Sequence, residues 1–294
     1  MNKSTNPTSR ALLVALVALG SSLAAFAPSA SAMLMVEESF SYDPGVLGLV
    51  NGGMGFNTEF RSGGGNAPAS WDVGSIVPRY TIVPGLTYAG LTSSGGALQL
   101  LDQPQSDWNA NLKRSFTTID TTTTQVWGSY LFRLDEIIGN GFAELKLGQP
   151  TNLDASLTMA VNASENSLLS SNVLAGEQTG PILGLGETTL IVWAYNNHAD
   201  VGDFNVGELL YWINPTLGVT PSVASAAIML NAGNSSSLGT MQIYGRLTDF
   251  VIDEIRIGTS FASVTPIPEA SSFAALAGAF GLLAAMTKRR RRTG

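Results

Sequence analysis

Asp249-Phe-Val-Ile-Asp-Glu-Ile-Arg-Ile257 is the stretch of this sequence that most clearly predicts a β-strand. Five of its nine residues are apolar and four of those are β-branched, a composition typical of strands. Because successive side chains of a strand point to opposite sides, alternate residues should share a face. One face would then carry Val251, Asp253, Ile255 and Ile257. A carboxylate among aliphatic side chains needs a partner, so the same strand predicts a buried polar contact at Asp253.

The rest of residues 33–265 has the pattern of an all-β domain. Short apolar runs rich in Thr, Ser and Val are separated by Gly, Pro and Asn, and no long helical period is present. Residues 125–133 and 141–147 flank the turn-prone Gly139-Asn-Gly141 and therefore predict a hairpin. Residues 188–195 are apolar on both faces, which predicts a strand in the middle of a sheet.

The strand predicted at residues 141–147 has two different faces. Ala143, Leu145 and Leu147 alternate with polar or larger residues and should face the core. The opposite face would carry Phe142, Glu144 and Lys146. The simplest interpretation of the two charges is a solvated face.

Three segments in the last third of the chain carry a resemblance. They are Thr189-Leu-Ile-Val-Trp193, Glu208-Leu-Leu-Tyr-Trp-Ile-Asn-Pro-Thr216 and Ile252-Asp-Glu-Ile-Arg-Ile-Gly-Thr-Ser-Phe-Ala-Ser-Val-Thr-Pro266. Together they resemble the concanavalin A-like, LamG-type jelly-roll domains. The resemblance implies one β-sandwich over residues 33–265, in which two antiparallel sheets pack face to face. Composition and periodicity alone leave a barrel equally open.

The start of the chain predicts export. Lys3 and Arg10 accompany an apolar run at residues 11–19, and Ala30-Ser-Ala32 fits a cleavage site of small residues. We therefore expect residues 1–32 to be a signal peptide that signal peptidase removes. An uncleaved signal anchor is the alternative, because apolar character continues beyond the run.

The end of the chain predicts a membrane helix. Every residue from Phe273 to Met286 is apolar or glycine. A helix over residues 270–287 would be about 25 Å long, which is just enough to span with snorkelling flanks. The basic cluster that follows would stay in the cytoplasm. It consists of Lys288, Arg289, Arg290, Arg291 and Arg292.

Residues 266–294 as a whole resemble the PEP-CTERM sorting signal of bacterial surface proteins. Pro268 and Glu269 match the start of that motif, while Ala270 stands where the family usually has a second proline. The resemblance implies recognition by exosortase, cleavage near Glu269, and a link to exopolysaccharide and the cell envelope. The precursor would be held in the inner membrane before reaching the surface or the medium. A plain C-terminal membrane anchor would have the same apolar helix and basic flank.

Charge and composition exclude several classes of function. Residues 33–265 carry 8 basic and 21 acidic residues, a net charge of −13, which argues against nucleic acid as a partner. Divalent cations or neutral glycans suit this charge better. The absence of cysteine excludes disulfides and thiolate chemistry. The single histidine, His198, lies among turn-forming Asn and Asp residues and is interpreted as a loop residue.

The sequence predicts that the protein is not an enzyme. Glycosidases place two carboxyls about 5–10 Å apart across the scissile bond. The adjacent pairs Asp135-Glu136 and Asp253-Glu254 would point to opposite faces of a strand. The alternative function is a secreted glycosidase or lyase, which would require that folding bring carboxylates from distant strands together.

Two tryptophans are candidate glycan contacts. Trp71 and Trp108 lie in polar, loop-like surroundings, and packing within their loops is the alternative. Trp193 and Trp212 lie in apolar strands and are expected in the core. We therefore predict a noncatalytic, exported surface or matrix protein, with glycans, including exopolysaccharide, as the candidate ligands.

A structural Ca²⁺ ion is the one candidate cofactor. The resemblance to jelly rolls implies that the first and last strands lie side by side, which would bring Glu37 or Glu38 near Asp253. Carboxylate oxygens are suitable calcium ligands. The alternative is that Asp253 accepts hydrogen bonds from the backbone or from Arg256.

Overall fold

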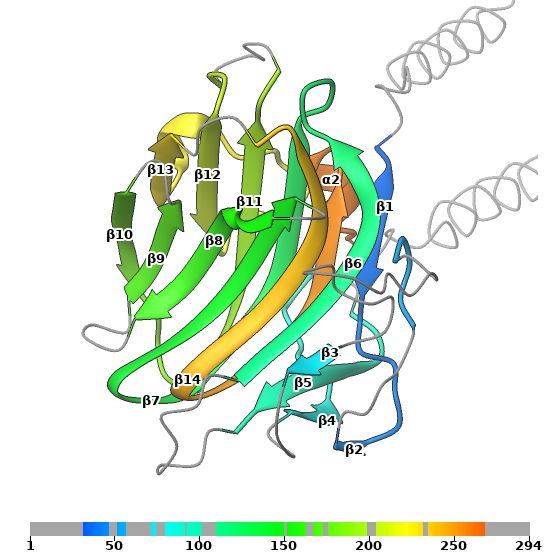
Figure 1. Ribbon diagram of the computed structural model, residues 1–294, viewed down its shortest axis with the longest axis vertical. Coiled ribbons are helices and arrows are strands. Elements are labelled where there is room, and N and C mark those ends of the chain that lie inside the picture. Colours follow the sequence, from blue (N-terminus) through cyan, green and yellow to red (C-terminus); the bar gives the residue numbers. More distant parts are fainter. Residues whose placement is uncertain are drawn as a thin grey trace, which may run out of the picture. The chain divides into compact units, whose positions relative to one another are not determined.

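The computed structural model describes residues 32–46, 52–56, 72–74, 80–91, 93–101, 110–149, 152–162, 167–172, 176–198, 204–231 and 235–267. They form an all-β, two-layer antiparallel sandwich, as predicted (Figure 1). The strands are accompanied by a 3₁₀ turn, Val223–Ser225, and a short helix, α2, Phe261–Val264.

The predicted targeting segments lie outside these residues. They comprise the signal peptide up to its last residue, the sorting motif from Pro268, the membrane helix and the basic cluster. Among the described residues, no helix has the length and apolar character needed to cross a membrane.

Strands β7 (Val126–Gln149) and β14 (Ser237–Gly258) form the centre of the fold. They have 24 and 22 residues, and they pair with each other along most of their length. The first part of β7 also pairs with β11 (Thr188–Asn196), and its second part pairs with β8 (Asn152–Asn162). Both long strands therefore run through both layers, and they join the described strands into one sheet folded onto itself.

The remaining strands extend the two layers outward. In the front layer of Figure 1 the order is β10 (Gly176–Ile182), β9 (Ser167–Asn172), β8, β7, β14, β6 (Ala110–Asp120) and β3 (Asp72–Gly74). The back layer contains β13 (Ile228–Asn231), β12 (Glu208–Ile213), β11, β7 and β14. The edge of β14 that pairs with β6 also pairs, further along the strand, with β5 (Gly96–Leu100) and then with β1 (Leu34–Glu38). Strand β4 (Tyr80–Pro84) pairs with β5, and β2 (Gly45–Val46) pairs with β4.

The main core lies between the two layers. Leu145 and Met159 enter it from the front layer, and Ile191, Trp193 and Tyr211 enter it from the back layer. Each of these side chains is at most 3% exposed. Burying a large apolar side chain contributes about 1.5–3 kcal/mol, so this contact between layers is the principal source of stability.

A second apolar cluster covers the outer face of the back layer. It combines Leu190 and Val192 of β11 with Trp212 of β12, and with Phe261 and Val264 of α2. Strand β11 is therefore buried on both faces. This confirms the prediction of a central strand at residues 188–195.

The hairpin predicted around Gly139-Asn-Gly141 is wrong. Both flanking segments belong to β7, and both pair with β14 rather than with each other. Gly139 has φ +59°, and the register with β14 shifts between Arg246 and Thr248. The turn-prone residues thus form a bulge within one strand, because a bulge lets a strand bend and continue.

The alternation predicted for the last strand fails after Asp253. Val251 packs in the outer cluster, whereas Ile255 and Ile257 lie in the main core. Glu254 has φ +51°, and the register with β7 shifts at this point. One extra residue in the strand reverses the faces of all residues that follow it.

Candidate functional site

The outer face of the front layer presents a group of aromatic and charged side chains. In β7, Phe142, Glu144 and Lys146 are partly exposed and alternate with core residues, as the sequence predicted. The residues opposite them in β14 are Arg246, Tyr244 and Gln242. Lys113 of β6 lies opposite Gln242 on its other side. We call these seven residues the outer-face patch.

Two aromatic rings lie at the centre of the outer-face patch. The Phe142 and Tyr244 ring centroids are 5.0 Å apart, with their planes inclined at 42°. Lys146 Nζ lies 5.1 Å from the Tyr244 centroid, and Arg246 Cζ lies 5.5 Å from that of Phe142. Cations within about 6 Å of a ring are attracted to its face, so the rings help to position both cations.

The charges of the patch are only partly neutralised. Lys146 Nζ and a Glu144 carboxylate oxygen are 2.7 Å apart, with side chains 25% and 19% exposed. Arg246 donates through Nη2 to the Asn140 carbonyl at 3.1 Å. Its Nε has no hydrogen-bond partner among the described residues. This nitrogen is itself buried, so it is not offered to a ligand; the partly exposed Lys113, which forms no ion pair with a described carboxylate, can still donate to one.

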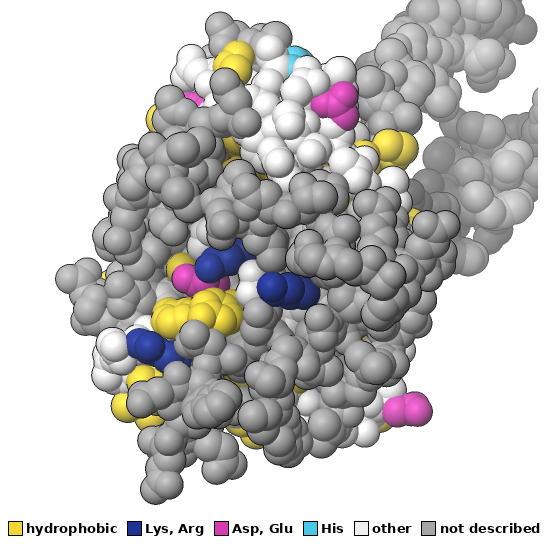
Figure 2. All heavy atoms as spheres, in the orientation of Figure 1, with side chains coloured by type: hydrophobic (Ala, Val, Ile, Leu, Met, Phe, Trp, Pro, Cys, Tyr) yellow, Lys and Arg dark blue, Asp and Glu magenta, His cyan; other side chains and the backbone are white. Residues whose placement is uncertain are grey.

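The Tyr244 phenol stays neutral in this setting. Burial raises its pKa, and the Glu144 carboxylate raises it further, while Arg246 opposes them. A neutral phenol can both donate and accept a hydrogen bond. Figure 2 shows the arrangement: basic and acidic side chains gather around hydrophobic ones in the middle of this face.

The carboxylates predicted as calcium ligands have separate partners. Strand β1 does pair with β14, as expected. Glu38 forms a buried ion pair with Arg114, whereas Glu37 is paired with Arg256 at 3.0 Å. Asp253 accepts hydrogen bonds from Leu86 N at 2.8 Å and from the amide of the next residue at 2.7 Å. This is the backbone arrangement expected as the alternative.

A metal site is not assembled by these residues in the described part of the chain. It contains no group of three His, Cys, Asp or Glu side chains able to hold an ion. Burial raises the pKa of Asp253 to about 8 despite its two backbone hydrogen bonds. Burial also raises the pKa of Glu254, which forms an ion pair with Arg256. The calcium site stays a prediction.

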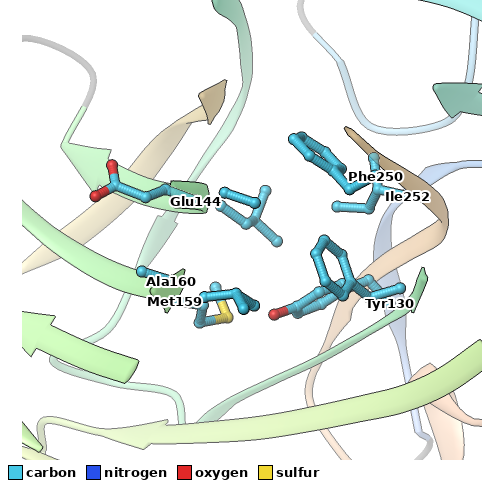
Figure 3. Close-up of a pocket in the computed structure, with 10 residues that line it drawn as sticks. Tyr130, Glu144, Met159, Ala160, Phe250 and Ile252 are labelled. Carbon is cyan, nitrogen blue, oxygen red and sulfur yellow. The ribbon is translucent and has the colours of Figure 1, made fainter. Parts of the chain in front are cut away.

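The cavity drawn in Figure 3 is too small for a ligand. It has a volume of about 10 Å³ and lies between the layers. Tyr130, Met159, Phe250 and Ile252 converge on it, while the Glu144 carboxylate points away. A space of this size holds one water molecule at most.

A second hollow opens at the surface near the end of β4. It has a volume of about 290 Å³, and its lining includes Tyr42, Pro44, Pro84 and Gly95. None of the residues that line it is charged. Its polar side chains, Ser41 and Tyr42, are hydrogen-bonded to Ser39 and Glu38, so the hollow has few polar groups with which to orient a ligand.

The predicted tryptophan contacts divide into two groups. Trp71 and Trp108 lie outside the described residues. Trp193 and Trp212 are 1% and 2% exposed, which confirms that they belong to the core. His198 is half-buried. The sequence placed Phe142 on the outer face but did not name it as a ligand contact, and it did not point to Tyr244 at all.

Comparison with known proteins finds no matching family model and no matching curated protein. Among solved structures, an endo-β-1,4-glucuronan lyase from the fungus Trichoderma reesei aligns with a TM-score of 0.40 and 14% identity, covering 64% of this chain and 89% of that one. A carbohydrate-binding module from Bacillus subtilis aligns at 0.36 and 11%, covering 60% and 93%. A lectin, UEA-II, complexed with galactose aligns at 0.37 and 9%, covering 57% and 88%. Likeness at this level transfers no function to this chain.

Proposed function

We propose that residues 33–265 form a noncatalytic glycan-binding module of an exported surface protein, with the outer-face patch as its binding site. The observation that carries the proposal is the Phe142–Tyr244 pair, two adjacent rings at outward positions of a sheet face. Flat apolar rings suit the faces of pyranose sugars. Partly exposed rings in the middle of a sheet are therefore a fitting platform for a sugar.

Polar groups around the rings would orient the ligand. The Tyr244 hydroxyl can donate and accept hydrogen bonds, and Glu144 can accept them, whereas Gln242 beside them is buried. Neighbouring strands lie about 4.8 Å apart, which places groups from β7, β14 and β6 within reach of one sugar or of two successive sugars. Sites built on central strands hold such groups in fixed positions.

The chemistry of the patch favours binding over hydrolysis. Glu144 is the one carboxylate among the seven residues of the patch, and it forms an ion pair with Lys146. Hydrolysis by two carboxyls would need a second one about 5–10 Å away. Asp253 and Glu254 are buried and committed to other partners. We therefore place this module among binding proteins rather than among secreted carbohydrate-active enzymes.

A glycan array probed with the purified full-length chain tests this function. We expect binding that falls about three- to tenfold when Tyr244 or Phe142 is replaced by alanine, the loss of one ring contact. Tyr88→Ala is the matched control, because Tyr88 is also half-buried but packs on the outer cluster of the back layer. Absence of binding to any glycan, or release of reducing sugar by the chain, would contradict the proposal.

Export and sorting complete the proposal and rest on the sequence. We propose that signal peptidase removes residues 1–32 and that exosortase acts on residues 266–294, at the inner membrane, before release to the cell surface. Replacing residues 288–292 by neutral side chains should then impair retention and processing. Cell fractionation measures this, and unchanged processing of the variant would speak against a sorting tail.

A further inference from the structure

The six basic residues in the described part of the body are distributed unevenly. Residues 33–265 as a whole carry eight basic residues against 21 acidic residues. Arg114, Arg133 and Arg256 lie outside the outer-face patch, and each forms an ion pair with a carboxylate. The outer-face patch, by contrast, has three cations and a single carboxylate; a further acidic residue, Asp72 of β3, lies opposite Lys113 in the register. An acidic protein thus presents a locally positive surface at its proposed binding site.

Two of the three cations form no ion pair with a carboxylate of the described residues. Of Lys113, Lys146 and Arg246, only Lys146 forms an ion pair with a described carboxylate. Arg246 uses one nitrogen on a backbone carbonyl.

The register fixes how far apart these cations are. Lys146 and Lys113 both lie opposite Gln242, on its two sides, so their strands are about 10 Å apart. Arg246 follows four residues further along β14, about 13 Å from Gln242 along the strand. A single carboxylate cannot pair with cations at all these positions, because an ion pair requires contact within about 4 Å. A polymer with a carboxylate on successive units can.

From this geometry we infer that the ligand of the outer-face patch is an anionic polysaccharide, with acidic sugars such as uronates along its chain. The inference rests on the proposed glycan-binding function and specifies its ligand class. The rings contact the sugar faces, and the cations pair with the carboxylates. Neutral glycans, which the net charge of the body favours, leave the cations without a role.

The net charge of −13 does not prevent this binding at physiological salt. The Debye length there is about 8 Å, so acidic residues further away are largely screened. The three cations would act in direct contact, where screening is weakest. An exposed ion pair contributes about 0.2–1 kcal/mol, so three pairs together change affinity by roughly three- to a hundredfold.

The test compares matched polymers on the purified full-length chain. Affinity electrophoresis or calorimetry would use polygalacturonate, the same polymer with its carboxyls methyl-esterified, and polyglutamate as an acidic chain without sugars. We expect polygalacturonate to bind at least about tenfold more tightly than either, with affinity falling as salt rises. Lys113→Gln and Arg246→Gln together should remove most of this preference while binding to the esterified polymer persists. Arg133→Gln, which removes a paired cation outside the patch, should change nothing.

Each outcome separates the two proposals. Equal binding of the charged and esterified polymers would overturn the anionic ligand but leave the glycan-binding function standing. Equal binding of polyglutamate and polygalacturonate would show a surface that recognises charge alone, and it would also overturn the inference. Binding of no polysaccharide would remove the proposed function itself.

Discussion

Asp253 of β14 is hydrogen-bonded to the backbone of the segment that follows β4. One of its oxygens accepts from Leu86 N, and the other accepts from Glu254 N. The side chain is 0% exposed, and burial raises its pKa to about 8. At neutral pH the folded protein therefore holds this carboxyl mostly in its protonated form.

This protonation predicts how stability depends on pH. The unfolded chain releases the Asp253 proton near pH 3.9, whereas the folded chain keeps it until about pH 8. Between these values the folded state binds more protons, so the free energy of unfolding should decrease as pH rises and level off above pH 8. The raised pKa of Glu254 acts in the same direction. Urea denaturation at pH 5, 7 and 9 measures the trend.

Asp253→Asn is the control for this dependence. It keeps the shape of the side chain, removes its titration, and loses one of two backbone hydrogen bonds at a cost of about 1 kcal/mol. The variant should therefore be less stable than the parent at pH 5 but show a flatter pH profile. An identical slope in parent and variant would assign the dependence to other groups.

The sequence predicted that Asp253 needs a partner but could not predict which one. Leu86 is 167 residues away along the chain, and contacts over such distances depend on topology. The sequence did not predict the outer-face patch, for a related reason. Phe142 and Lys146 were correctly placed facing outward, but the beginning of β14, which contains Tyr244 and Arg246, was not predicted as a strand.

Within β7, Gly128 is required by the strand beside it. It lies opposite Trp193 of β11, and a Cβ atom at this position would overlap the indole ring. Because Trp193 is fully packed in the main core, the ring cannot move aside without disturbing its neighbours. Gly128→Ala should therefore lower the free energy of unfolding by about 1–3 kcal/mol, as overpacking does.

A second glycine of the same strand is the matched control. Gly139 has φ +59°, but the space around its Cβ position is open. Asparagine tolerates this conformation, so Gly139→Asn should cost less than Gly128→Ala. Denaturation midpoints of the two variants decide. A larger loss for Gly139→Asn would show that backbone strain, rather than packing, limits β7.

Bulges explain why individual strands were predicted better than their connections. Residues 125–133 and 141–147 do form strand, yet a bulge replaces the expected turn between them. Turn residues and bulge residues are the same types, because both need unusual φ values. Pairing with β14 decides between them here, and that pairing is not visible in the local sequence.

For the whole body, two apolar clusters and the absence of cysteine predict stability without cross-links. Residues 33–265 should fold as one cooperative unit, since β7 and β14 belong to both layers. Circular dichroism should show a β-sheet spectrum and a single thermal transition that reducing agent leaves unchanged. A helical spectrum, or two separate transitions, would contradict this architecture.

The fold class followed from composition and period, because strands with a buried face leave a regular pattern. The choice of a sandwich over a barrel came from a resemblance, and the structure bears it out. No sequence pattern indicated that two strands, β7 and β14, each belong to both layers.

This sharing also determines how the body would respond to a mechanical load. A pull on the C-terminal end enters through β14, which is bound by β7 on one side and by β6, β5 and β1 on the other. Such a strand cannot be peeled away alone, because its hydrogen bonds in both layers resist at once. A molecule tethered at that end would therefore carry tension through the strand with the most neighbours, the same strand that holds Tyr244 and Arg246 of the outer-face patch.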